Sequence, residues 1–111
     1  MDQLRRVSTF LSNHQDKYEL FDIEGHTNRT GSFGYNMRLS KRRSEYVRRY
    51  LTSKGVAMSK FKPRGYGFTR PYPNTRPEDG INRRVMLIPR GQNDLVSVAD
   101  EFNQEFSNQY R

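Results

Sequence analysis

The sequence contains no cysteine, which excludes a disulfide framework, a thiolate metal site and a cysteine nucleophile. It contains two histidines, His14 and His26, and neither lies near clustered carboxylates in the sequence. The sequence therefore predicts no metal site and no cofactor. No candidate nucleophile has an adjacent base. Glu24 is the acid nearest to His26, and we expect it on a strand, where its carboxylate faces solvent or forms an ion pair. We expect a protein that is not an enzyme.

Long hydrophobic runs are also missing. No segment is long and apolar enough to span a membrane, and no signal peptide is recognisable. Apolar residues make up 32% of the chain, a low fraction, but they are concentrated in periodic segments. That concentration favours a small folded domain over disorder. With 111 residues the chain is large enough for one domain with a single modest core.

Acidic residues are few compared with basic ones. The chain has 12 Asp and Glu against 20 Lys and Arg, which gives a net charge of +8. This balance predicts an anionic partner, and nucleic acid, membrane headgroups and an acidic cell-wall polymer all fit. A nucleic-acid reader would use tyrosines as stacking platforms, and the candidates are Tyr46, Tyr50, Tyr66 and Tyr72. Because Tyr50 is expected on the core stripe of its helix, we rank nucleic acid last and expect no nucleic-acid partner.

Helical periodicity and capping residues predict three helices. A short first helix ends at Asn13 and is indicated by the spacing of Leu4, Val7, Phe10 and Leu11. A long helix runs from about Phe33 to Ser53, with Ser32 as its N-cap and Gly55 as a left-handed C-cap. A C-terminal helix is indicated by Leu95, Val98, Phe102 and Phe106.

Three further segments are predicted as strands. The first is Tyr18 to Glu24, and the second covers residues 60–66, where Pro63 lacks a ladder donor and places the strand at a sheet edge. The last runs from Arg83 to Ile88 and is closed by Pro89 and Gly91. The strand, helix, strand order from residue 18 to 66 requires a crossover, so the first two strands are expected to be parallel. Residues 68–80 form a long irregular connection, and loops of that length are usually functional or mobile.

One arginine of the long helix stands where an apolar residue is expected. Arg43 lies midway along the stripe formed by Leu39, Val47, Tyr50 and Leu51. An arginine directed at a core needs a carboxylate, backbone carbonyls or a ligand, because an unpaired buried charge costs several kcal/mol. The alternative is a side chain whose stem packs while its head reaches water. Arg42, its neighbour, is expected on the solvated side.

The polar loop before this helix is bracketed by Gly25 and Gly31. Such a loop turns sharply and presents backbone N–H groups at a helix N-terminus, where an anion is favoured. A simple turn with an N-cap explains the same residues.

Two segments resemble motifs of one protein family. Residues 25–44 read GHTNRTGSFGYNMRLSKRRS, and residues 80–85 read GINRRV. They are similar to the GHTD, YN, LS, RA and NRRV motifs of the OmpA-like C-terminal domain, which is shared by outer-membrane proteins, the Pal lipoprotein and the MotB stator protein. The resemblance covers about residues 2–90. It implies an α/β (α+β) two-layer sandwich of the βαβαβ type with a mixed sheet, whose first strand is missing here and which carries an extra C-terminal helix.

The resemblance also implies a function, non-covalent binding of peptidoglycan. At the position of Arg43, family members hold the α-carboxylate of diaminopimelate, the diamino acid of the stem peptide, and the planar guanidinium suits that carboxylate. The first arginine of the NRRV motif lines the pocket, which here is Arg83. The ligand-binding residues implied are Thr27, Asn28, Thr30, Gly31, Asn36, Leu39, Arg43, Asn82 and Arg83.

Position 28 departs from the family pattern. Family members generally carry Asp there, and its carboxylate faces the ammonium of diaminopimelate, whereas this chain has Asn28. Asn keeps one acceptor oxygen but loses the charge, which should weaken binding by about tenfold. Three alternatives follow: a weakened wall binder, a binder retuned to a different stem peptide, or a domain that has lost the ligand and acts as a protein-interaction module.

Further expectations follow from the resemblance. Residues 1–91 would form the peptidoglycan-binding domain and residues 92–111 a C-terminal helical extension. The domain would work in the periplasm and tether a larger envelope protein to the wall, with its outer-membrane or inner-membrane anchor in a parent segment. The edge left by the missing strand would be completed by the parent chain or by a neighbouring molecule, which includes a homodimer, or be covered by the C-terminal helix.

Overall fold

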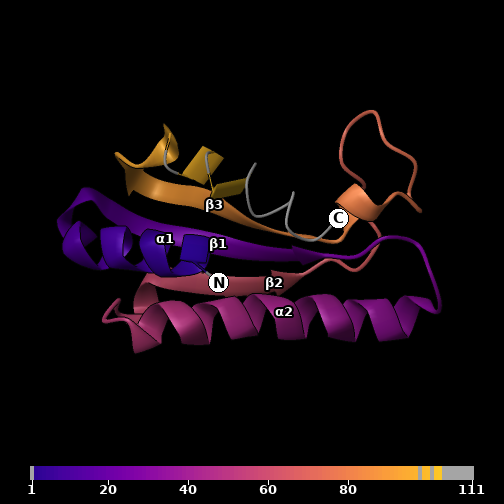
Figure 1. Cartoon of the computed structure of the whole chain (residues 1–111), viewed down its shortest axis with the longest axis horizontal. Coiled ribbons are helices and arrows are strands. Elements are labelled where there is room, and N and C mark those ends of the chain that lie inside the picture. Colours follow the sequence, from indigo (N-terminus) through magenta and orange to yellow (C-terminus); the bar gives the residue numbers. More distant parts are fainter. Residues whose placement is uncertain (1, 98, 101, 104–111) are drawn as a thin grey trace.

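Three strands form one sheet in the computed structural model, with the order β2-β1-β3 (Figure 1). The structure describes residues 2–97, 99–100 and 102–103. The main elements are α1 (Asp2–Asn13), β1 (Tyr18–His26), α2 (Phe33–Ser53), β2 (Phe61–Gly65) and β3 (Arg84–Asn93). Short 3-10 turns lie between them, namely η1 (Gln15–Lys17), η2 (Met58–Lys60) and η3 (Gly80–Asn82). Within the described residues, no helix is long and apolar enough to cross a membrane.

The sheet is mixed, as the sequence predicts. β1 is parallel to β2, with Phe21 opposite Phe61 and Gly25 opposite Gly65, and α2 is the crossover between them. β1 is antiparallel to β3, with Ile23 opposite Leu87. β2 lies at a sheet edge, so Pro63 costs no ladder hydrogen bond there. The expected two-layer α/β architecture is confirmed.

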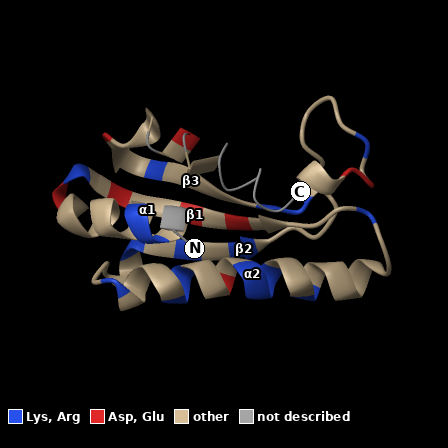
Figure 2. Ribbon diagram, viewed as in Figure 1, with Lys and Arg blue, Asp and Glu red and all other residues tan. Residues whose placement is uncertain are grey.

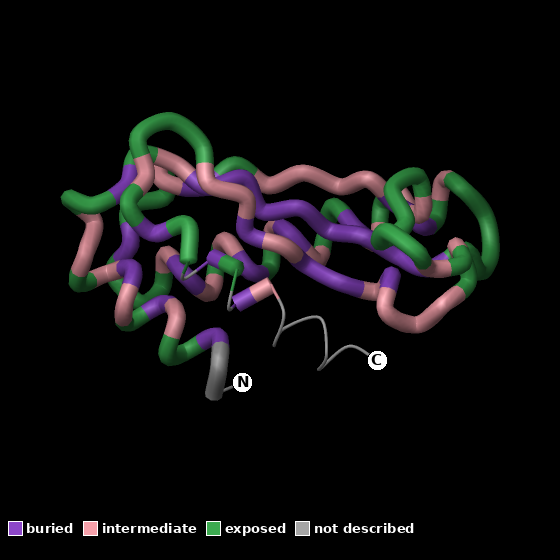
Figure 3. Tube along the Cα trace, turned by 90° about the horizontal axis from the view of Figure 1, so that it is seen from above, coloured by how far each residue is buried: buried purple, intermediate pink, exposed green. Residues whose placement is uncertain are grey.

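The hydrophobic core lies between one face of the sheet and the helices. The strands contribute Phe21, Ile23, Phe61, Val85 and Leu87, and the helices contribute Leu4, Leu11, Val47 and Leu51. All of these side chains are almost fully buried, and burial of each is worth about 1.5–3 kcal/mol. Figure 3 shows that the buried stretches follow the strands, while exposed segments gather in the loops at the two ends.

Helix α2 begins and ends where its capping residues predict. The Ser32 hydroxyl accepts a hydrogen bond from the Tyr35 N–H at 3.2 Å, which caps the N-terminus. At the other end, Gly55 has φ of +102° and its N–H donates to the Thr52 carbonyl at 3.1 Å.

The N-terminal half of α2 packs against the sheet through small side chains. A Cβ at Gly25 would clash with the Ser40 carbonyl oxygen, and one at Gly65 would lie 2.5 Å from the Lys41 amide nitrogen. At this distance only small residues fit, so the buried residues of this half are Asn36, Ser40 and Ser44. The expected apolar stripe is therefore wrong in this half. Further along, Val47 and Leu51 are buried and the half-buried Tyr50 packs against the core, as expected. Leu39 and Arg43 lie beside the contact and are half-buried.

Strand β3 is longer than the sequence predicts. It begins at Arg84, not at Arg83, and continues to Asn93, so Pro89 and Gly91 do not close it. Leu20 lies opposite Arg90 and Tyr18 opposite Asn93, so β3 has one extra residue in this interval. Gly91 lies in this bulge with φ of +66°, a conformation that favours glycine.

The outer edge of β3 is capped by a side-chain amide. Asn103 accepts from the Leu87 N–H at 2.7 Å and donates to the Leu87 carbonyl at 2.9 Å, as a neighbouring strand would. Pro89 lies two residues after Leu87, so its backbone nitrogen faces the same outer edge of β3. Proline has no N–H that could pair with another strand. These two features protect the edge from pairing with another strand.

The segment after β3 packs onto the same core. Its described residues 96–97, 99–100 and 102–103 are helical, and Leu95, Ala99 and Phe102 are buried. Val98 and Phe106, which we placed on the same helical face, lie outside the described residues. The division of the chain at residue 91 stays a prediction, although β3 crosses that point.

The opposite face of the sheet carries charged residues. Asp22 is buried in β1 and accepts hydrogen bonds from Arg64 of β2 at 3.2 Å and from Arg90 of β3 at 2.9 Å. One carboxylate thereby joins all three strands. Figure 2 shows the acidic positions of β1 in the middle of the sheet, with basic positions on the neighbouring strands.

Candidate ligand-binding site

Two loops meet at the end of the sheet where β1 and β2 finish (Figure 1). One is the polar loop after β1, residues 27–32, and the other is the long connection from residue 66 to 82. The Thr27 N–H donates to the Gly67 carbonyl and the Arg29 N–H to the Pro77 carbonyl, both at 2.8 Å. These backbone bonds hold the two loops together as one unit.

Asn28 lies inside this junction and is buried. Its side-chain nitrogen donates to the Glu78 carbonyl at 3.1 Å, and its side-chain oxygen accepts from the Thr30 hydroxyl at 3.3 Å. The two contacts determine the orientation of the amide, because the nitrogen can only donate and the oxygen can only accept.

Asn36 ties the first loop to the first turn of α2. Its side-chain nitrogen donates to the Thr30 carbonyl at 2.7 Å and to the Ser32 carbonyl at 2.9 Å. Between them Gly31 has φ of +81°, in the left-handed region that favours glycine. The structure thus brings together Thr27, Asn28, Thr30, Gly31 and Asn36 as the sequence predicts.

Asn82 organises the second loop from inside. It is 1% exposed, and its oxygen accepts from the Tyr72 N–H at 2.6 Å while its nitrogen donates to the Arg76 carbonyl at 2.7 Å. Its nitrogen also lies 3.2 Å from the Thr75 hydroxyl. The amide is therefore used by the loop backbone, and a contact of Asn82 with ligand stays a prediction.

Arg43 and Leu39 lie on the face of α2 that begins beneath the joined loops. They follow Asn36 by seven and three residues, about two turns and one turn along the helix. Both side chains are half-buried, and the Arg43 Nη1 atom is fully buried. Arg42, by contrast, is exposed, as the sequence predicts.

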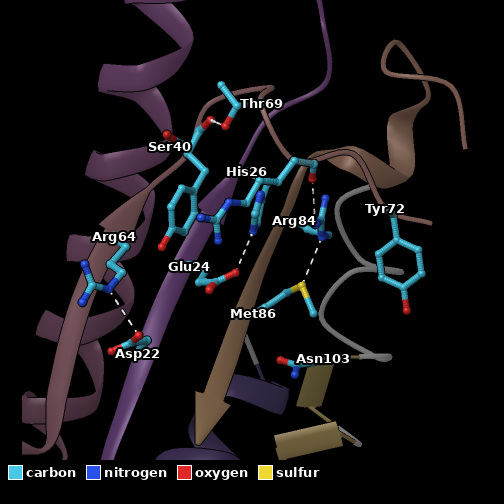
Figure 4. A network of polar contacts seen from close by, with 12 residues as sticks. Asp22, Glu24, His26, Ser40, Arg64, Thr69, Tyr72, Arg84, Met86 and Asn103 are labelled. Atoms are coloured by element: carbon cyan, nitrogen blue, oxygen red, sulfur yellow. Dashed lines mark hydrogen bonds and ion pairs between the residues drawn. The ribbon is translucent and has the colours of Figure 1, made fainter. Parts of the chain in front are cut away.

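The two arginines at the start of β3 differ in their surroundings. Arg83 is half-buried and its guanidinium lies next to Gly80, where a Cβ would be 3.0 Å from Nη2. Arg84 is buried, donates to the Arg70 carbonyl at 3.0 Å and lies over the Tyr72 ring at 5.2 Å (Figure 4). Burial lowers the pKa of Arg84. Arg84 therefore holds the second loop, a role that sequence reasoning missed.

A histidine and a glutamate of β1 form a buried pair on the sheet face opposite the hydrophobic core (Figure 4). His26 Nε2 lies 3.1 Å from Glu24 Oε1, and the His26 ring stacks on Tyr66 with 5.6 Å between centroids. Burial lowers the pKa of His26, so the ring is neutral near pH 7 and donates from Nε2. The hydrogen bond from His26 in turn lowers the pKa of Glu24. Glu24 is therefore buried and hydrogen-bonded to a neutral histidine, which differs from the solvent-facing or ion-paired role expected from the sequence.

The site contains one buried hydroxyl whose hydrogen-bonding capacity is unused. Thr27 Oγ1 makes no hydrogen bond within the described part of the chain. Buried polar atoms are normally hydrogen-bonded, so such an atom is a candidate for a ligand contact. The described residues contain no group of His, Asp and Glu that could hold a metal ion.

Comparison with known proteins identifies the family. A family model described as the OmpA family matches residues 1–84. The chain belongs to the OmpA family. It is 34% identical over 87 residues to the peptidoglycan-associated lipoprotein of Buchnera aphidicola, which covers 77% of this chain and 49% of that protein. It is 36% identical over 85 residues to outer membrane protein A of Shimwellia blattae, which covers 77% and 35%.

A solved structure supports the same assignment. The crystal structure of the peptidoglycan-associated lipoprotein from Burkholderia pseudomallei matches with a TM-score of 0.64 and 27% identity, over 78% of this chain and 74% of that one. The resemblance inferred from the motifs is thereby confirmed, together with the fold class. The chain spans about half or less of the length of the two relatives named above.

Proposed function

We propose that this OmpA-family domain binds peptidoglycan non-covalently, through the diaminopimelate of the stem peptide, and catalyses no reaction. The observation that carries the proposal is the position of Arg43. A half-buried arginine on α2, about two turns along the helix from the joined polar loops, can offer a guanidinium to a carboxylate and still be reached from solvent. The family to which the chain belongs includes proteins named as peptidoglycan-associated.

The guanidinium of Arg43 would pair with a ligand carboxylate through two parallel hydrogen bonds. Partial burial strengthens such a pair, because less water screens the charges. The unused Thr27 hydroxyl of the first loop and the half-buried Arg83, which directly follows the second loop, would add polar contacts.

The location follows from the same reasoning. Both relatives named above are proteins of the cell envelope by name, a lipoprotein and an outer membrane protein. We infer that the domain works in the periplasm and tethers a larger envelope protein, whose anchor lies in another segment, to the wall.

Asn28 favours a second candidate function, a protein-interaction module that no longer binds the wall. Its amide is already engaged with Glu78 and Thr30 and brings no negative charge to the site. In that case the joined loops would serve as a rigid scaffold for a protein contact.

Co-sedimentation with purified peptidoglycan sacculi tests the proposal. The natural domain should pellet with sacculi, and free diaminopimelate should compete. Arg43→Ala should abolish pelleting, because loss of a desolvated charge-assisted pair costs a few kcal/mol, about a hundredfold in affinity.

The matched control is Arg42→Ala, which removes an identical charge one residue away on the exposed side. An exposed charge contributes less than about 1 kcal/mol, so this variant should pellet almost as the natural domain does. Equal losses in both variants would show that general basicity causes the binding. No binding to sacculi by the natural domain would favour the interaction module, and tight DNA binding with a steep salt dependence would favour nucleic acid.

A further inference from the structure

The contact between Asn28 and Glu78 depends on an amide at position 28. The Asn28 nitrogen donates to the Glu78 carbonyl across 50 residues of sequence. An aspartate at this position would present a carboxylate oxygen to that carbonyl, and two acceptors repel each other. Asn28 therefore fastens the long loop to the end of β1 in a way that an aspartate would not.

This contact also places an acidic residue beside the site. Glu78 and Asp79 are the two acids of the joined loops, which Figure 2 shows as the acidic stretch of the long loop. The Asp79 carboxylate is occupied within the loop, where it accepts from the Arg76 N–H at 3.0 Å. The Glu78 residue is exposed, and its carboxylate makes no hydrogen bond or ion pair within the described residues.

The rest of the site is basic. Arg29 belongs to the first loop, Arg76 belongs to the second, Arg83 directly follows the second, and Arg43 lies on helix α2. A ligand that carries both a carboxylate and an ammonium needs an anion for its second charge, and a charged hydrogen bond contributes about twice a neutral one. Glu78 is the acid of the two loops whose carboxylate is available for that purpose.

We propose that Glu78 supplies the negative charge that recognises the ammonium group of the ligand. Asn28 positions Glu78 through its hydrogen bond to the Glu78 backbone carbonyl. The inference rests on the proposed function, since it concerns the diaminopimelate site. In this chain the long loop provides the negative charge that position 28 lacks. The carboxylate and the ammonium of the ligand are then both recognised by charged side chains.

Calorimetric titration with two small ligands tests this assignment. One ligand is diaminopimelate, and the other is pimelate, which has the same carbon chain and both carboxylates but no amine. Glu78→Gln should weaken diaminopimelate binding by about tenfold, the loss expected for one charged hydrogen bond, and should leave pimelate binding unchanged. The double variant Asn28→Asp with Glu78→Gln should recover part of the lost affinity, because a carboxylate returns to the site.

Asp16→Asn is the matched control. Asp16 is exposed and lies in η1 at the start of β1, about 26 Å along the strand from the loops, and its loss changes the net charge equally. It should bind both ligands as the natural chain does.

The possible outcomes separate the two proposals. Unchanged diaminopimelate binding in Glu78→Gln would overturn the role of Glu78 and leave the proposed function intact. Equal losses for diaminopimelate and pimelate would also overturn it, because they would indicate a general disturbance of the loop. Failure of the natural chain to bind diaminopimelate would overturn the proposed function and this inference together.

Discussion

The core and the loop end of this molecule are held together by different forces. The core is formed by apolar side chains such as Ile23, Leu51 and Leu87, which pack without directional preference. At the loop end, three buried asparagines, Asn28, Asn36 and Asn82, each donate hydrogen bonds to backbone carbonyls. Because one amide both donates and accepts, it can fasten two segments that have no apolar surface to share.

This difference indicates that stability depends mainly on the core and that ligand binding depends mainly on the loop end. Packing is summed over many contacts, so a change in the core should lower the free energy of unfolding and disturb the whole domain. Hydrogen bonds at the loop end determine where a few side chains lie, so a change there should affect binding more than stability. Three substitutions test this comparison.

Gly25→Ala should have the largest effect. Its new Cβ would clash with the Ser40 carbonyl oxygen, which is backbone and cannot rotate away, so α2 must shift from the sheet. We expect a loss of about 3 kcal/mol in the free energy of unfolding, measured by urea denaturation, together with a loss of sacculus binding.

Gly34→Ala is the matched control for that change. Gly34 lies within α2, and its Cβ would meet only the Arg38 side chain at 3.4 Å. Alanine in a helix is favoured over glycine by about 1 kcal/mol, so this variant should be as stable as the natural chain or more so. Similar losses in both variants would show that the close contact between α2 and β1 is not needed.

Asn82→Ala should have an intermediate effect that is concentrated at the loop end. It leaves the Tyr72 N–H and the Arg76 carbonyl without their partner, and each unsatisfied group costs about 1–3 kcal/mol if it stays buried. Because the loop can open to water, we expect a loss of only about 1–2 kcal/mol in stability but a large loss of ligand affinity. Amide hydrogen exchange should become faster in residues 70–80.

The control for Asn82 is Asn13→Ala, at the exposed end of α1. It should change neither exchange in the long loop nor binding. If Asn82→Ala leaves loop exchange unchanged, the loop is held by its own backbone contacts and the comparison between core and loop end fails.

His26→Gln should have the smallest effect, which depends on pH. Because burial lowers the pKa of His26, the unfolded chain binds a proton more readily than the folded one, and stability should fall as the pH drops below about 6.5. The pKa of Glu24 is also lowered, so further stability should be lost below about 4.5.

Glutamine can still donate to Glu24 but does not titrate. The variant should therefore keep the decline below about pH 4.5 and lose the decline that begins near pH 6.5. Urea midpoints measured from pH 7.5 to 4 check this prediction, and identical pH profiles for the two proteins would contradict it.

The sequence by itself determined the local features of this protein. Ser32, Gly55 and Pro63 mark helix ends and an edge strand because they act through their own backbone conformation or hydrogen-bonding groups. The motifs at residues 25–44 and 80–85 were sufficient to indicate the OmpA family, which the comparison confirms. The residues that we placed at the ligand site remain predictions, although the structure gathers several of them at the junction of the two loops.

Only the tertiary structure decided how distant segments use their polar groups. Arg83 and Arg84 are identical neighbours in the sequence, yet Arg84 is buried beside Tyr72 because the long loop folds over the side of β3 that it occupies. The hydrogen bond between Asn28 and Glu78 joins residues that are 50 positions apart in the sequence. The spacing of apolar residues within one helix or strand does not indicate which distant residues will meet. Hydrogen bonds to backbone carbonyls depend on where the folded chain places those carbonyls, and that placement exists only after the core has formed.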